Sequence, residues 1–385
     1  MSREEFLLKL KDDRKFLKES NEHINKIMEM MEKGYDNDKI RGAFRKTKYL
    51  EEMTEFAKSR IKVRRKFSRY DQLWMDTYSA SYSTPEIPAI YRSEKLRGRK
   101  ILDAGSGAGM QSIFFSTNSK VTGVDLNMER VYMAQLNAMA YDSNANFIHG
   151  DIFQLGDVGG KYDTVFSDPL RGKTSEERFL EELSPNPLDI LEYFSGVVGN
   201  FVFDLPPMIR QDKLSRLNGE LEYLSLNGAL QRLTSYSGSE RKYSAVMLPS
   251  GLSFSSPKVD KNEDTGGNWS EILFVPDPSL FYSHLENQYC LSKGMKPVQR
   301  EKRKSIFAAE GSIADSMGEY FRVVKSGDYE VIKKFLKGSK FGKIYLKYDS
   351  PDYYGEKNNL ENGLTGNHSG YIFKIREEFV LCEKI

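Results

Sequence analysis

Three glycines at alternate positions, followed by an apolar helical pattern, are the part of this sequence best suited to ligand chemistry. They are Gly105, Gly107 and Gly109, and they follow the short apolar run Ile101-Leu102. Glycines let a backbone turn sharply and approach a ligand closely, and the start of a helix presents unsatisfied N–H groups. A dinucleotide fingerprint would require glycine at position 110, where the chain has Met110. We therefore predict a nucleotide-binding turn that is not of the dinucleotide class.

Three carboxylates follow the glycine turn, each after a short apolar run. Asp125 lies 20 residues after Gly105, the separation at which an acid ending a second strand can bond both ribose hydroxyls. Asp151 follows a third apolar run, and Asp168 ends a fourth, directly before Pro169. Ligands bind at the carboxyl ends of parallel strands, so these acids are expected beside the glycine turn. For each acid alone, a solvated turn or a helix cap is the alternative.

Such placement requires strands and helices in alternation. Apolar runs predict strands that end at or near the acids, at 100–104, 120–126, 145–153 and 162–168, and further strands at 200–205, 221–226 and 243–248. Helical spacing follows the glycines at 110–114 and recurs at 127–141, with Asn127 as the N-cap. This alternation predicts an α/β fold, a Rossmann-like doubly wound and largely parallel sheet with helices on both faces.

The form Asp103-x-Gly-x-Gly-x-Gly109 resembles motif I of the class I S-adenosylmethionine (SAM) methyltransferases. The resemblance implies SAM as the cofactor, with Asp103 near its methionine end and the glycines packed beneath it. It also implies that Asp151 accepts a hydrogen bond from the adenine amino group while an apolar neighbour covers the ring. The expected cofactor-binding residues are Asp103, Gly105, Gly107, Gly109, Asp125, Leu126, Asp151 and Ile152.

The segment Asp168-Pro169-Leu170-Arg171 is similar to the Asp/Asn-Pro-Pro-aromatic motif of enzymes that methylate exocyclic amines, without the second proline and the aromatic residue. Asp168 can accept hydrogen bonds from the N1–H or N2 amino edge of guanine, and Arg171 can bind a phosphate or a purine acceptor. We expect Asp168, Pro169 and Arg171 to be catalytic, with guanine N2, N7 and N1 all open as the target atom. The fourth strand carries no cysteine, which argues against a covalent adduct on a pyrimidine carbon.

Segments outside motif I resemble a narrower family, the SAM-dependent methyltransferases with a C-terminal THUMP-like domain. The segments are Arg65-Lys-Phe67, Pro88-Ala-Ile-Tyr-Arg92, Asp168 to Arg171, Glu222 to Gly228, Val246 to Gly251 and Pro276-Asp-Pro278. The resemblance implies an RNA substrate, most simply a tRNA guanosine, because THUMP domains belong to tRNA-modifying enzymes. The chain departs from the family at Phe203-Asp204-Leu-Pro-Pro207, where a basic residue is more usual. The expected organisation is a helical N-terminal domain (1–75), a SAM methyltransferase domain (76–308) and a small α+β THUMP-like domain (309–385).

A run of seven cations without an acid supports the expectation of RNA binding. The cations stand at positions 58, 60, 62, 64, 65, 66 and 69. Like charges at this density repel one another unless an anion binds them, although a solvated helix face is the alternative. We expect RNA contacts from Lys62, Arg64, Arg65 and Lys66, and from Arg92 on the substrate side. A second basic run, at 296–304, fits an exposed loop equally well.

Composition limits the remaining possibilities. A length of 385 residues suits two or three domains, and hydrophobic residues at 39% supply ample core. The two cysteines, Cys290 and Cys382, lie far apart, which argues against a zinc site or a disulfide framework. No segment approaches the ~20 apolar residues of a membrane span or resembles a signal peptide. We expect a cytoplasmic protein without a metal, a membrane association or an obligate protein partner.

Two other functions remain open on the sequence alone. One is a SAM-dependent methyltransferase acting on a small molecule or a protein, which would bind SAM but show no salt-dependent RNA binding. The other is a non-catalytic RNA-binding protein with a relict fold, which would fail to bind SAM.

Overall fold

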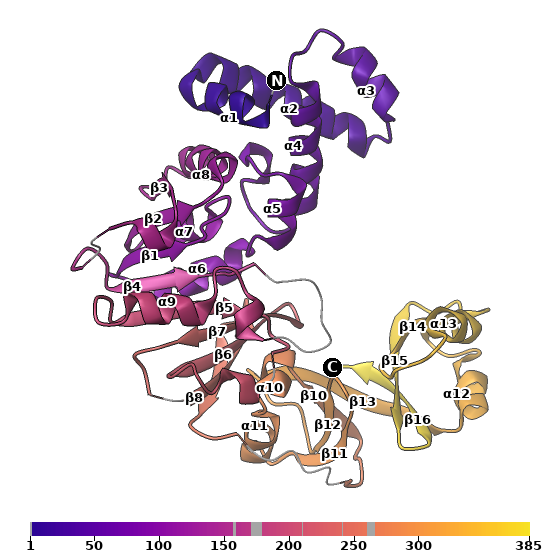
Figure 1. The fold of residues 1–385 in the computed structure, drawn as a ribbon. Helices are drawn as coiled ribbons and strands as arrows, with labels where there is room; N and C mark the ends of the chain where they lie inside the picture. The colour runs from indigo at the N-terminus through magenta and orange to yellow at the C-terminus, as the bar shows by residue number, and fades with distance from the viewer. Residues whose placement is uncertain (1, 157–158, 171–178, 210, 241, 260–265) are drawn as a thin grey trace. The chain divides into compact units, whose positions relative to one another are not determined.

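The computed structural model describes residues 2–156, 159–170, 179–209, 211–240, 242–259 and 266–385 (Figure 1). The chain divides into two compact units. The first contains residues 1–219 and 234–240, and the second contains residues 220–233 and 241–385. The chain passes between the two units within strand β7 (Ala229–Tyr236).

Helices occupy the start of the first unit, as the sequence predicts. They are α1 (Arg3–Asp12), α2 (Arg14–Glu32), α3 (Asn37–Ala43), α4 (Leu50–Val63), the 3-10 turn η1 (Tyr70–Gln72), α5 (Thr77–Tyr82) and α6 (Glu86–Lys95). Side-chain caps explain several of their starts, because Asp13, Asp36 and Asp76 each accept a hydrogen bond from a backbone N–H of the following first turn. Buried Phe6, Leu7 and Leu10 of α1 belong to the same hydrophobic core as Met133 and Leu136 of helix α8 (Met128–Ala140).

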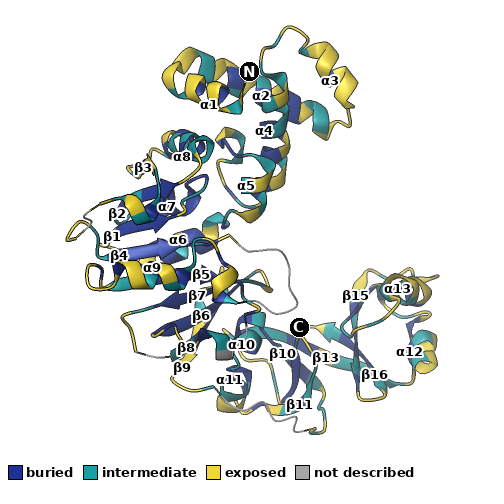
Figure 2. Ribbon diagram, viewed as in Figure 1, coloured by how far each residue is buried: buried dark blue, intermediate teal, exposed yellow. Residues whose placement is uncertain are grey.

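A parallel sheet follows the helices within the first unit. Its strands are β1 (Lys100–Ala104), β2 (Lys120–Asp125), β3 (Asn146–His149), β4 (Thr164–Ser167) and β5 (Asn200–Leu205), in the spatial order β3-β2-β1-β4-β5. The connecting helices are α7 (Met110–Phe115), α8 (Met128–Ala140) and α9 (Pro187–Phe194), with 3-10 turns η2 (Ile152–Gln154), η3 (Leu180–Glu182) and η4 (Gln211–Leu214). The order reverses between β1 and β4, which both run through the buried interior (Figure 2). In doubly wound sheets the ligand binds at such a reversal, outside the carboxyl ends of the strands.

The second unit contains two groups of strands. In the first, β6 (Glu220–Leu226) pairs in parallel with β8 (Lys242–Leu248), which pairs antiparallel with β9 (Leu252–Ser256). The second is a seven-stranded sheet in the order β11-β12-β10-β13-β16-β15-β14. Its strands are β10 (Ile272–Pro276), β11 (Lys296–Arg300), β12 (Ser305–Ala309), β13 (Gly318–Gly327), β14 (Phe341–Leu346), β15 (His368–Ile375) and β16 (Glu378–Lys384). The helices of this unit are α10 (Pro278–Tyr282), α11 (Glu286–Ser292), α12 (Tyr329–Leu336) and α13 (Tyr353–Glu361).

The structure confirms the α/β sheet and the helices predicted around the glycine turn, including Asn127 as the N-cap of α8. It corrects three stretches. Residues 315–324, whose sequence favours a helix or a helix-to-strand connection, lie largely in strand β13 (Gly318–Gly327). The basic run at 296–304 contains strand β11, in which Arg300 pairs with Glu286. Strand β7 was not predicted. The N-terminal helical and THUMP-like domains stay predictions, and β10 to β16 share one sheet that crosses the predicted boundary at residue 309.

Candidate functional site

The glycine turn joins the end of β1 to the start of α7. Gly105, Gly107 and Gly109 all adopt left-handed backbone conformations, with φ of 85°, 55° and 83°. A Cβ atom on Gly109 would lie 2.7 Å from the Cβ of Ala134 on α8, so this glycine allows the helices to pack closely. No described residue lies within 4 Å of the position that a Cβ would take on Gly107. The turn therefore presents open backbone at its middle glycine.

Asp125 ends β2 and holds the glycine turn in place. Its Oδ2 accepts a hydrogen bond from the backbone N–H of Gly107 at 2.8 Å, and its Oδ1 accepts one from Asn127 at 2.9 Å. Each carboxylate oxygen has a second lone pair for a ligand hydroxyl. Leu126, the next residue, is 71% exposed. Open glycine backbone, an oriented carboxylate and an exposed apolar side chain together fit the ribose and adenine of SAM.

Asp103 lies inside the fold, 2% exposed, at the end of β1. The hydroxyl of Ser112, on α7, donates to its Oδ2 at 2.6 Å. Burial raises the pKa of Asp103 to about 7 because the charged carboxylate loses hydration, and the negative charge of Asp168 adds to this effect. The hydrogen bond from Ser112 opposes the rise. The carboxyl group is thus placed where a nearby cation would favour its ionised form.

Asp151 and Ile152 follow β3, as predicted. Asp151 is the N-cap of η2, where its Oδ1 accepts from the backbone N–H of Phe153 at 2.9 Å and its Oδ2 accepts from Gln154 at 3.2 Å. Ile152 is buried. The cap that was considered as the alternative for this acid is therefore present, and any contact with adenine would use a remaining lone pair.

Asp168 stands at the end of β4 beside the glycine turn. The segment after it is fixed, because Pro169 is buried and Leu170 exchanges backbone hydrogen bonds with Ser184 at 2.7 and 3.0 Å. The next residue, Pro185, lies 3.4 Å from the position of a Cβ on Gly105. Arg171, the third expected catalytic residue, lies outside the described residues.

Thr84, which was not among the predicted site residues, approaches the same carboxylate. This buried residue lies between α5 and α6, and its hydroxyl donates to Oδ2 of Asp168 at 3.5 Å. The available signal was the proline that follows, Pro85, because proline favours turns and extended backbone.

The prediction that Arg92 contacts RNA is wrong for this structure. Arg92, on α6, is 1% exposed and forms a buried ion pair with Asp204, with Nη2 and Oδ2 2.7 Å apart. It also donates to the side chain of Gln111, on α7. A buried charge requires a partner, and Asp204 of β5 supplies it here. Arg92 positions α6 and α7 against the sheet.

The predicted RNA-binding run divides into buried, bonded and exposed cations. Arg60 is buried, and the loss of hydration lowers its pKa to about 9. Lys66 donates to the backbone carbonyls of Ala80, Ser81 and Ser83 at 2.8, 2.9 and 3.2 Å, and so caps the end of α5. The side chains of Lys62, Arg64 and Arg65 are exposed, although Lys62 bonds the Ser81 hydroxyl and Arg64 pairs with Glu32.

A metal-ligand cluster and a membrane-spanning helix are both absent from the part of the chain that the structure describes. No group of three or more His, Cys, Asp or Glu side chains there is arranged to hold a metal ion. No described helix combines the length and the apolar character needed to cross a membrane.

Comparison with known proteins gives this geometry a context. Residues 101–184 match the family of methyltransferase domains. A Methanocaldococcus jannaschii protein named as a protein N5-glutamine methyltransferase is 26% identical over 137 residues, which cover 34% of this chain and 68% of that one. Trimethylguanosine synthase of Schizosaccharomyces pombe is 31% identical over 144 residues, which cover 32% and 59% of the respective chains. The matches thus extend over about a third of this chain.

A solved structure is similar over most of the chain. The crystal structure of a methyltransferase from Porphyromonas gingivalis W83 superimposes with a TM-score of 0.70 at 15% identity, covering 87% of this chain and 90% of that chain. At this identity the likeness shows the fold. The chain therefore contains a class I SAM-dependent methyltransferase domain, and SAM is its cofactor.

Proposed function

We propose that this protein is a SAM-dependent methyltransferase of RNA whose target is a guanosine, most simply in tRNA, at the exocyclic N2 or at ring nitrogen N7 or N1. The observation that carries the proposal is the position of Asp168. Its carboxylate ends the strand next to β1, beside the glycine turn, and Thr84 bonds one of its oxygens. A hydrogen-bond acceptor in that position can orient an N–H edge of a purine toward a bound methyl donor.

The residues of this chain have separable tasks in that proposal. SAM, when bound, supplies a methyl group on an excellent leaving group, so the protein mainly has to position the nucleophile and exclude water. Asp125 and the glycine turn hold the cofactor, and Asp168 accepts a hydrogen bond from the guanine edge. The hydroxyl of Thr84 approaches one oxygen of that carboxylate at 3.5 Å, the outer limit of a hydrogen bond. If the target is N7, which carries no proton, Asp168 acts by orienting the base through its N1–H or N2 amino group.

Support for a nucleic-acid substrate comes from the exposed cations Lys62, Arg64 and Arg65 and from one relative. That relative is named as a trimethylguanosine synthase, and it is 31% identical over 144 residues. A guanine edge that donates a hydrogen bond to Asp168 could present either N2 or N7 for methylation.

A protein substrate is the second candidate, because the Methanocaldococcus jannaschii relative is named for an amide nitrogen of glutamine. An amide N–H can donate to Asp168 as an amino group of guanine does. The two candidates differ in electrostatics, since only RNA binding releases condensed counterions.

Salt-dependent binding separates the candidates. We expect unmodified tRNA transcripts to bind in filter-binding assays, with affinity falling about tenfold or more between about 50 and about 200 mM salt. Calorimetry with SAM is run in parallel on the same preparation. Tight SAM binding without measurable RNA binding would favour the protein or small-molecule substrate, and failure to bind SAM would contradict both methyltransferase proposals.

A further inference from the structure

Two exposed tyrosines stand on α5, the short helix that leads into the candidate site. Tyr78 and Tyr82 are 45% and 54% exposed, and their ring centroids lie 4.8 Å apart with a 48° angle between the ring planes. Paired aromatic rings exposed to water are a common feature of surfaces that bind single-stranded nucleic acid, because every base can stack on them. Neither tyrosine belongs to the machinery described above.

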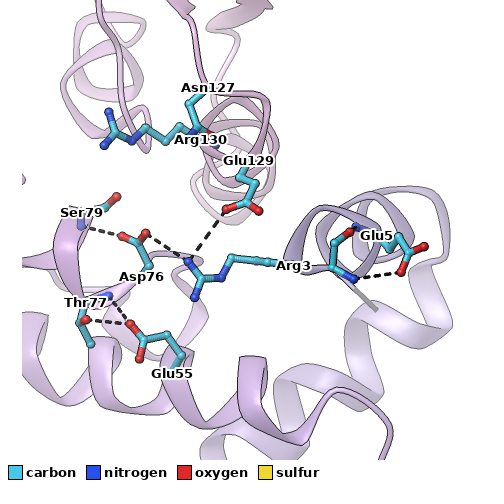
Figure 3. A network of polar contacts seen from close by, with 10 residues as sticks. Arg3, Glu5, Glu55, Asp76, Thr77, Ser79, Asn127, Glu129 and Arg130 are labelled. Atoms are coloured by element: carbon cyan, nitrogen blue, oxygen red, sulfur yellow. Dashed lines mark hydrogen bonds and ion pairs between the residues drawn. The ribbon is translucent and has the colours of Figure 1, made fainter.

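Helix α5 is held rigidly at both ends, and Figure 3 shows its first turn. Asp76 accepts from the backbone N–H of Ser79 at 2.7 Å and lies 3.5 Å from the guanidinium of Arg3. Glu55 accepts from the backbone N–H and the hydroxyl of Thr77 at 3.0 and 2.7 Å. Lys66 caps the other end of the helix. A fixed platform loses little conformational entropy when a ligand binds.

Cations of the predicted RNA-binding run lie against this helix. Lys62 is exposed and donates to the hydroxyl of Ser81, which stands between the two tyrosines in sequence. The guanidinium carbon of Arg130, on the first turn of α8, lies 5.4 Å from the ring centroid of Tyr78. Of the acids near this helix, Asp76 and Glu129 pair with Arg3, and Glu55 accepts from Thr77. The surface thus combines aromatic rings with positive charge.

The same helix connects to both parts of the site. Tyr82 precedes Thr84 by two residues, and Thr84 bonds the Asp168 carboxylate. Arg130 lies one turn beyond Asn127 on α8, next to Leu126 and Asp125 of the cofactor side. A nucleotide stacked on Tyr82 would therefore bind two residues along the chain from Thr84, which contacts the carboxylate proposed to hold the target base.

We propose that Tyr78 and Tyr82 form a base-stacking platform that binds RNA nucleotides flanking the methylated base, with Lys62 and Arg130 contacting the adjacent phosphates. This inference rests on the proposed RNA methyltransferase function and names the residues that select its substrate.

The test compares four proteins in RNA binding and in methyl transfer from labelled SAM, with unmodified tRNA transcripts as the probe. They are the wild type, Tyr78→Ala/Tyr82→Ala, Tyr78→Phe/Tyr82→Phe and Tyr35→Ala. Tyr35 is the matched control, an exposed tyrosine with a lysine, Lys39, 5.7 Å from its ring centroid. We expect the double alanine variant to lose roughly 10- to 100-fold in RNA affinity and to raise KM for RNA more than it lowers kcat. The phenylalanine and Tyr35 variants should stay within about twofold of wild type, since both retain the rings of the platform.

SAM affinity, measured by calorimetry, serves as the check on folding. If the alanine variant binds SAM less tightly than wild type, Tyr78→Leu/Tyr82→Leu replaces it, because leucine retains apolar volume but removes the ring. If a correctly folded alanine or leucine variant binds RNA with the same affinity as wild type, the stacking platform is wrong. The proposed methyltransferase function would not be affected by that result. Wild-type protein that neither binds nor methylates RNA would overturn both.

Discussion

The carboxylate of Asp168 separates cofactor binding from methyl transfer. It ends β4 and is bonded by Thr84, whereas the cofactor-side contacts come from Asp125 and the glycine turn. We expect Asp168→Asn to leave the SAM dissociation constant within about twofold and to lower the transfer rate at least about 100-fold, the scale of a lost positioning contact. Calorimetry and a labelled-SAM transfer assay measure the two quantities, with Asp38→Asn, an exposed acid of α3, as the control. Full activity of Asp168→Asn would remove this residue from the mechanism.

Asp125 should show the reverse pattern. Its carboxylate orients Gly107 and Asn127, and the ribose of SAM would share its remaining lone pairs. Loss of charge-assisted hydrogen bonds costs about 1.5–3 kcal/mol each, so Asp125→Ala should weaken SAM binding at least roughly 10-fold. Glu377→Ala, which removes a carboxylate that is almost fully exposed, is the control for calorimetry. Unchanged SAM affinity would place the ribose elsewhere.

Asp103 should make stability depend on pH. Its pKa is raised from 3.8 to about 7 in the folded protein, so the native state binds more protons than the unfolded chain between these values. The contribution of Asp103 to stability therefore falls by about 4 kcal/mol at most as pH rises through this window. Above the window this contribution is constant. Asp103→Asn keeps an acceptor for Ser112 and removes the titration. We expect the free energy of unfolding of the variant, minus that of wild type, to increase from about pH 4 to about pH 7 in denaturant titrations. Parallel curves would mean that Asp103 ionises normally.

At the scale of single elements, two glycines of one turn should respond differently to the same substitution. Gly109→Ala places a Cβ 2.7 Å from Ala134 and 2.8 Å from Phe147 and also forces a left-handed φ on alanine, so it should lower the free energy of unfolding by about 2–5 kcal/mol. Gly107→Ala meets no described residue and pays the cost of a left-handed φ, about 1–2 kcal/mol. Only Gly107→Ala should weaken SAM binding more than its loss of stability explains. Denaturant titration and calorimetry distinguish the two, and the opposite ranking would contradict the position assigned to the cofactor.

The segment from the end of α4 to α5 mixes structural and ligand-binding cations. Lys66→Ala would leave three backbone carbonyls without their ammonium partner and should destabilise the protein by about 1–3 kcal/mol. Arg65→Ala removes an exposed charge and should change stability by about 0.5 kcal/mol or less while reducing the slope of RNA affinity against salt. Thermal unfolding and filter binding across salt concentrations measure both effects. Equal RNA binding by Arg65→Ala and wild type would mean that Arg65 is an exposed cation that does not contact RNA.

At the scale of the whole molecule, the glycine-turn domain could be predicted because its signals are local. The apolar runs, the glycine turn and the Asn127 cap each lie within a few residues of the element they specify. Strands β11 and β13 depend on partners far along the chain. Strand β11 contains polar residues such as Lys296 and Arg300, so its hydrophobic alternation is too weak to predict a strand. Strand β13 pairs with β10 on one side and β16 on the other, and neither partner is visible in its own sequence.

The same distinction explains the candidate site. Asp125 and Asp168 were predictable because strand ends define them. The role of Arg92 was not, since its partner Asp204 lies 112 residues further along and only the folded sheet brings them together. Lys66 looked like a ligand-binding cation because its charge is visible in sequence, whereas the carbonyls of α5 that it caps are not.

The most direct test of the proposed function is incubation with labelled SAM and unmodified tRNA transcripts, followed by digestion of the RNA to nucleosides. We predict label in a single methylated guanosine, and its identity distinguishes N2, N7 and N1. The Asp168→Asn variant should give no label above background under the same conditions. Label recovered only in protein, or none at all although SAM binds, would contradict an RNA guanosine as the target.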